Sequence, residues 1–117
     1  MQIPVITTDT IASAVTGSGT FVYDMRGANV ASLQLTATLS STNTDVVTLQ
    51  ISNDGTNYVG FSTAKTVTFT GGGTLSAVFE LGLIDYVYLR VSYAAPSAGT
   101  LTLVGTLYAT AGITRDA

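Results

Sequence analysis

Apolar and polar residues alternate along several segments of this chain, and this pattern restricts the possible fold more than any other feature. The clearest case is the segment 30–39, where every second residue from position 33 is apolar: Leu33, Leu35, Ala37 and Leu39. A period of two places one face of a strand in a core and the other face in solvent or an interface. The 3.6-residue apolar spacing of an amphipathic helix is absent. The alternation therefore predicts β-structure.

Turn-forming residues divide the chain into about eight expected strands. We expect strands at 11–15, 20–24, 30–39, 85–93 and 100–109, a hairpin across 45–62, and a second hairpin made of 65–70 and 75–81. The polar segment 40–44 and the glycine run 71–73 are expected to be loops. Turn signals recurring roughly every 8–12 residues are typical of an all-β sandwich or barrel. The sequence predicts an antiparallel β-sandwich, either jelly-roll-like or another Greek key.

The length of 117 residues fits one domain. We expect residues 1–19 to form an extended N-terminal arm, up to residue 10, followed by an edge strand. Residues 20–110 are expected to form the sandwich, and residues 111–117 a C-terminal tail. The first residues lack the basic and apolar regions of a signal peptide.

Charged residues make up only 9% of the chain, against about 25% in an ordinary soluble domain. A small surface with so few charges is expected to be partly covered, most simply by copies of the same chain. The net charge of −3 and the scattered basic residues argue against nucleic acid as a partner. An apolar run of the roughly 18 residues that span a membrane is absent, so we expect no membrane partner.

Catalytic chemistry finds little support in the residues present. The chain contains no histidine and no cysteine, which removes the usual general base and the commonest metal ligands. Ser-Lys chemistry would depend on Lys65 alone. The glycine runs lack the lysine and the spacing of phosphate-binding loops. We expect no enzyme activity, no catalytic residues, no cofactor and no metal.

The segment Asn53, Asp54, Gly55, Thr56 and Asn57 lies between the two expected strands of the central hairpin. Asp-Gly supplies the positive φ that a short turn requires, and Asn tolerates it. A calcium loop is the alternative, but such loops carry several carboxylates. Four other aspartates (Asp9, Asp24, Asp45 and Asp85) are interpreted as strand-end residues that bond to nearby backbone.

A second candidate site is the row Tyr86, Tyr88 and Arg90, which an alternating strand would place on one face. Aromatic residues and arginine are enriched at protein interfaces. Three interpretations remain open for this row: an interface, burial within the fold, and a ligand platform. A carbohydrate platform would use Tyr58, Tyr86 and Tyr88.

Three segments, ISNDGTNYVGFS (51–62), YVYLRVSY (86–93) and SAGTLTLVGTLYA (97–109), resemble small β-sandwich proteins encoded in tailed-phage structural gene clusters. In those proteins a strand–SNDGTNW–strand hairpin precedes a YVRVRV-type strand and a Gly-Thr-led final strand. The similarity covers roughly residues 30–109. Discoidin-like carbohydrate-binding sandwiches carry a similar hairpin, and Tyr58 stands where both groups usually have tryptophan.

The phage resemblance implies a virion protein: a capsid decoration (cement) protein on the capsid surface, made in the host cytoplasm, or a fibre or tail component. Decoration proteins are often homotrimers that clamp the major capsid protein or other virion proteins through an extended arm. By this analogy the arm lies in residues 1–10, with Ile3, Pro4, Val5 and Ile6 as interface residues. The alternative is a fibre- or tail-associated module that binds a glycan.

Overall fold

The computed structural model describes the backbone of residues 2–112 and the side chains of residues 5–110. Within this range the chain forms seven antiparallel strands: β1 (Gln2–Val15), β2 (Gly19–Asp24), β3 (Ala28–Ser52), β4 (Val59–Gly60), β5 (Thr66–Leu83), β6 (Tyr88–Tyr93) and β7 (Leu101–Gly112). None of the described residues is helical, so this range has no helix that could span a membrane. The prediction of an all-β fold is confirmed.

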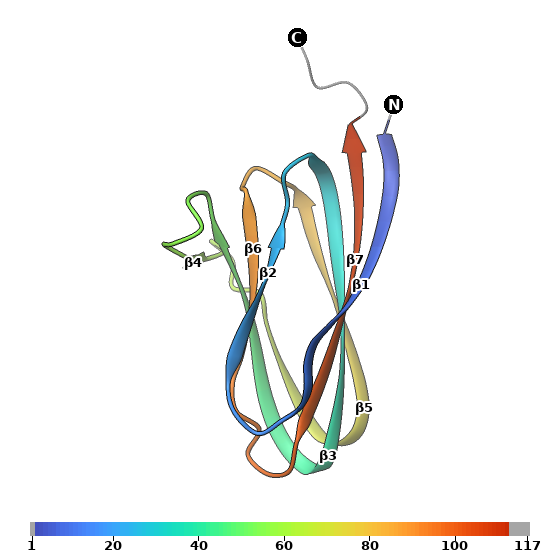
Figure 1. The fold of residues 1–117 in the computed structure, drawn as a ribbon, viewed down its shortest axis with the longest axis vertical. Coiled ribbons are helices and arrows are strands. Elements are labelled where there is room, and N and C mark those ends of the chain that lie inside the picture. Colours follow the sequence, from blue (N-terminus) through green and yellow to red (C-terminus); the bar gives the residue numbers. More distant parts are fainter. Residues whose placement is uncertain (1, 113–117) are drawn as a thin grey trace.

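The strands form one sheet that folds over into two layers (Figure 1). In sheet I, β1 pairs with β7, β7 with residues 28–39 of β3, and these with residues 73–83 of β5. In sheet II, β2 pairs with β6, β6 with residues 47–52 of β3, and residues 44–48 of β3 with the first part of β5. The short strand β4 pairs with the end of β3. Apart from β4, each layer has four strand segments, with β3 and β5 shared between the layers, which is a jelly-roll-like arrangement.

The segments 40–44 and 71–73 differ from their expected roles as loops. Both lie within strands, because β3 and β5 stay paired as they bend from one sheet into the other. Gly71 and Gly73 have φ values of 116° and 85°, which only glycine adopts without strain. The expected second hairpin is therefore wrong: residues 66–70 and 75–81 belong to one bent strand, β5, whose two halves pair with opposite halves of β3.

The core lies between the two layers and contains the apolar residues that the alternation placed inward. Leu33, Leu35 and Ala37 of β3 are fully buried, as are Leu89 and Val91 of β6. The outer faces of β3 and β5 are rich in threonine, and hydroxyl pairs bridge these two strands, including Thr36–Ser76 at 3.1 Å and Thr38–Thr74 at 3.2 Å. The alternation thus separates a dry interior from a hydroxyl-covered exterior.

The N-terminal segment, expected as an extended arm followed by an edge strand, forms one continuous strand. Residues 2–15 pair with residues 101–112 of β7, with register shifts around Ala12. The backbone is extended as expected, but it is hydrogen-bonded into its own sheet. Since β1 ends the strand order of this layer, its other edge is unpaired among the described residues. Residues 111 and 112 of the expected C-terminal tail belong to β7, and residues 113–117 lie outside the described residues.

Candidate functional site

The turn after β3 is built around the hydroxyl of Ser52. This oxygen accepts hydrogen bonds from the backbone N–H groups of Asp54 (3.2 Å) and Gly55 (3.0 Å), and it donates to Asp54 Oδ1 at 2.9 Å. Gly55 has a φ of 76°, the left-handed conformation that glycine favours. Residues 53–57 therefore connect β3 to β4 as a compact, self-bonded turn.

The carboxylate of Asp54 holds the rest of this turn. Its Oδ1 accepts from the N–H groups of Thr56 and Asn57, both at 2.8 Å, and its Oδ2 accepts from Asn57 Nδ2 at 2.8 Å. These hydrogen bonds, led by those from the Asn57 and Thr56 backbone, hold the pKa of Asp54 below its ordinary value. Because both carboxylate oxygens serve the turn, the geometry does not support a calcium loop. The described residues also contain no group of three His, Cys, Asp or Glu that could hold a metal.

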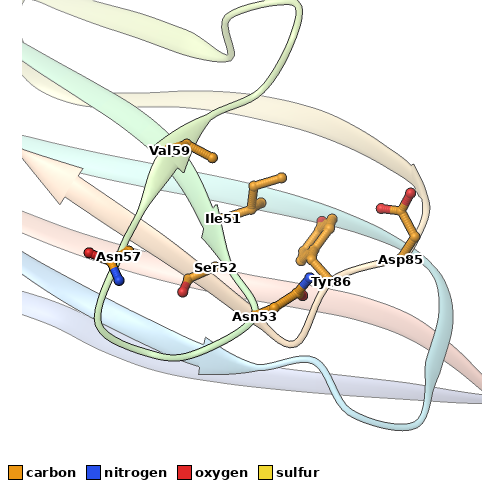
Figure 2. Close-up of a pocket in the computed structure, with 7 residues that line it drawn as sticks. All are labelled: Ile51, Ser52, Asn53, Asn57, Val59, Asp85 and Tyr86. Carbon is orange, nitrogen blue, oxygen red and sulfur yellow. The ribbon is translucent and has the colours of Figure 1, made fainter.

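A hollow of about 190 Å³ lies between this turn and the segment that leads into β6 (Figure 2). Asn53 points toward that segment, and its Oδ1 accepts a hydrogen bond from the backbone N–H of Val87 at 3.0 Å. Asp85 and Tyr86 line the other side of the hollow. This contact fixes the turn to a segment more than thirty residues further along the chain.

Tyr86 does not lie on the outer face with Tyr88 and Arg90, so that part of the prediction is wrong. Its side chain is only 8% exposed, and its ring meets Phe61 edge-on at 5.8 Å between centroids. The alternation fails because β6 begins at Tyr88, and the preceding residues form a bend. Burial, together with the nearby charge of Asp85, raises the pKa of Tyr86 to about 12.

Tyr88 and Arg90 do lie on the outer face of sheet II, where both are half-buried. The ring of Tyr88 packs against Gly55 of the turn. Arg90 donates from Nε to Oε1 of Gln50 at 2.8 Å, and its guanidinium lies 4.0 Å from the centre of the Tyr58 ring. The row is thus a cross-strand cluster of Gln50, Tyr58, Tyr88 and Arg90.

The expected carbohydrate platform of Tyr58, Tyr86 and Tyr88 is not assembled. Tyr86 is buried, and one face of Tyr58 carries the Arg90 guanidinium. The three rings therefore do not form one open platform.

The predicted N-terminal interface residues fall into two groups. Val5 and Ile6 are 48% and 68% exposed on β1. The backbones of Ile3 and Pro4 pair with Ala111 and Thr110, but their side chains lie outside the described residues. Their role in an interface stays a prediction.

Asp45 is a feature that the sequence reasoning missed. It was interpreted as a strand-end residue bonded to nearby backbone, but it lies within β3, is 1% exposed, and neither carboxylate oxygen has a hydrogen-bond partner among the described residues. Burial raises its pKa to about 6. The sequence carried one signal for this position: Asp45 precedes Val47 and Leu49 at the inward spacing of two.

Comparison with known proteins identifies the fold and no family. No family model matches the chain, and no curated protein matches it in sequence. Several solved structures share its fold. The SPBc2 prophage-derived protein YomS superposes with a TM-score of 0.58 at 11% identity, over 92% of this chain and 96% of that one.

Two further solved structures share this fold. The PBSX exported protein XepA matches with a TM-score of 0.57 at 13% identity over 98% of this chain, which spans 39% of XepA. The Tobacco streak virus coat protein matches with a TM-score of 0.51 at 16% identity, over 95% of this chain and 86% of that one. At these identities the similarity establishes a shared β-sandwich fold.

Proposed function

We propose that this chain is a non-enzymatic structural protein of a tailed-phage virion, most specifically a capsid decoration (cement) protein that self-associates as a homotrimer and bridges shell subunits. Prophage-derived and viral coat proteins are among the structures with this fold. The sequence resemblance to tailed-phage sandwich proteins points the same way. Location at the capsid surface, after synthesis in the host cytoplasm, follows from this role.

The observation that carries the proposal is the chemistry of the exterior. Both sheets present outer faces of threonine, serine and aliphatic residues with few charges, and three aliphatic side chains on sheet I are largely exposed: Ile6 at 68%, Val78 at 62% and Leu83 at 74%. Covering such a surface with another protein removes apolar area from water and therefore lowers the free energy. A protein that works by being covered is a structural component.

The edge of β1 supports a bridging role for the N-terminal segment. This strand of 14 residues has one edge unpaired among the described residues, and an unpaired edge can accept another strand. In the proposed role, residues 2–10 contact a neighbouring shell subunit through that edge while staying paired with β7. Many weak contacts of this kind add up across a particle through avidity.

The test is co-purification with phage particles combined with the solution mass of the isolated protein. We expect a multiple of the 12.0 kDa chain mass in multi-angle light scattering, and binding to particles that lack the protein. Particles with the protein bound should resist heat or chelation better than particles without it. A monomer that does not bind particles would overturn the proposal.

A further inference from the structure

The outer face of sheet I carries one charged side chain among residues 5–110, that of Glu80. Register places Glu80 in a row with Ser32, Tyr108 and Ile6 across the four strands of this layer. The neighbouring rows contain threonine, serine, glutamine and valine. Glu80 is exposed and forms no ion pair with another described residue. This face therefore presents a single negative charge on a neutral background.

The outer face of sheet II presents a single positive charge, that of Arg90. Register places Arg90 between Val22 of β2 and Gln50 of β3. Asp24 and Arg26 lie at the end of the same layer, but they form a salt bridge with each other. Their charges cancel, so Arg90 is the uncompensated cation of this face within the described chain.

The contacts of Arg90 fix its guanidinium and leave its outer end free. Nε is used by Gln50, and one face of the plane lies on Tyr58. The two terminal nitrogens have no hydrogen-bond partner among the described residues. A guanidinium held in this way is preorganised to bind a carboxylate through two parallel hydrogen bonds.

The surroundings of Glu80 suit such a cation. Glu80 borders a shallow hollow of about 220 Å³ that Val30 and Tyr108 also line, and both of these side chains are 44% exposed. Apolar walls lower the local dielectric when the face is covered, which strengthens a charge pair formed there. The sheet I face thus offers an unpaired carboxylate, and the sheet II face offers an unpaired guanidinium that can bind it.

We propose that two copies of this chain associate face to face in a head-to-tail manner, with the Arg90 face of sheet II on one copy covering the Glu80 face of sheet I on the next. This inference deepens the proposed function, because it assigns self-association to two specific surfaces. A pair of copies joined in this way keeps one face of each kind free. A contact between unlike faces is heterologous, so repeated contacts build a closed ring where the rotation between copies closes and an open stack where it does not.

Charge reversal tests the pairing. We expect Glu80→Arg to weaken self-association at least about tenfold, since it places two cations together, and Arg90→Glu to do the same. The double variant Glu80→Arg/Arg90→Glu should restore the oligomer. Sedimentation equilibrium at low and high salt measures all four proteins. Asp85→Arg, which makes the same charge change at an exposed site away from the face, is the matched control and should leave the mass unchanged.

Folding of Glu80→Arg is checked by circular dichroism, and because Glu80 is exposed this variant decides the matter even where Arg90→Glu fails to fold. A folded Glu80→Arg protein with unchanged association would overturn the inference. So would a double variant no better associated than the singles.

Cysteine cross-linking distinguishes unlike-face from like-face packing, since the chain has no cysteine of its own. Val78→Cys lies next to Glu80 and Val22→Cys next to Arg90. Oxidation of an equal mixture should yield the mixed dimer, whereas each variant alone should stay largely uncross-linked. Dimers formed by one variant alone would contradict the head-to-tail contact.

Binding to particles is measured separately on the same variants. Loss of self-association with particle binding retained supports the face pairing and leaves the virion role intact. If the unmodified protein and the double variant self-associate but neither binds particles, the pairing is supported and the virion role is contradicted.

Discussion

The guanidinium of Arg90 lies 4.0 Å from the centre of the Tyr58 ring. Tyr58 belongs to the connection after the turn at 53–57, and Arg90 to the middle of β6. The contact therefore ties a short, weakly paired segment to a central strand of sheet II.

We expect Tyr58→Ala to destabilise the fold by about 0.5–2 kcal/mol, the range of a partly desolvated cation–π contact. Urea denaturation measures the change. Tyr58→Phe is the matched control, because it keeps the ring and should lose much less. If Tyr58→Ala and Arg90→Met were additive in a double-mutant cycle, the two side chains would not be coupled.

Asp54 of the turn is expected to make the stability of the fold depend on pH in the acid range. Hydrogen bonds to its charged form hold the pKa of Asp54 below the ordinary value, so its contribution to stability is present above the unfolded-state pKa. That contribution is lost as the pH falls further, toward the lowered pKa of the folded state. Asp54→Asn should lower the urea midpoint at pH 7 and flatten the fall in stability below about pH 4.

The matched control for this change is Asp85→Asn, at an exposed aspartate outside the turn, which should leave the urea midpoint at pH 7 unchanged. Equal acid profiles for Asp54→Asn and the unmodified protein would show that the turn bonds contribute nothing to stability.

Asp45 predicts the opposite dependence on pH. Burial raises its folded-state pKa to about 6, above the value in the unfolded chain, so the folded state binds the proton more tightly. Between about pH 4 and pH 6 its contribution makes the fold less stable as the pH rises. Asp45→Leu should remove that slope and raise stability at pH 7, on the order of 1–3 kcal/mol. Stability measured from pH 4 to pH 7 checks this, and an unchanged slope would contradict it.

Gly105 predicts a steric requirement in the core. A Cβ at this position would collide with the Tyr23 hydroxyl and with Ile11, so Gly105→Ala should cost about 1–3 kcal/mol through overpacking. Gly60→Ala is the matched control, because a Cβ there meets nothing within 4 Å. Thermal unfolding compares the two variants, and equal melting temperatures would show that the core yields at Gly105.

Alternation in the sequence predicted the core of this fold well. Leu33, Leu35 and Ala37 are buried as expected, because a strand within a two-layer sheet keeps its period wherever its pairing continues. The same rule failed at Tyr86, which precedes the first paired residue of β6. Side-chain direction there depends on how the bend packs under the turn at 53–57, and no local pattern encodes that packing.

The prediction of loops at 40–44 and 71–73 is wrong for a related reason. Serine, threonine and glycine favour both loops and sharply bent strands, so the residue types alone did not distinguish the two. What decides is that both bends fall opposite each other, with Leu39 paired to Gly73 and Asn43 to Gly71. This coincidence depends on pairing between distant parts of the chain.

The sequence predicts individual residues of the candidate site, but it does not predict which of them come into contact. The turn residues and the outward Tyr88 and Arg90 followed from local rules. The partners Gln50 and Tyr58 depend on the register of β3 against β6 and on the path of the turn, which the sequence alone does not give.

The joint bend of β3 and β5 also has a mechanical consequence. Since β3 and β5 run continuously through both layers of the sandwich, a load that pulls on one layer is carried through covalent backbone into the other. The two layers therefore cannot slide or separate at the bend without breaking the hydrogen bonds between β3 and β5.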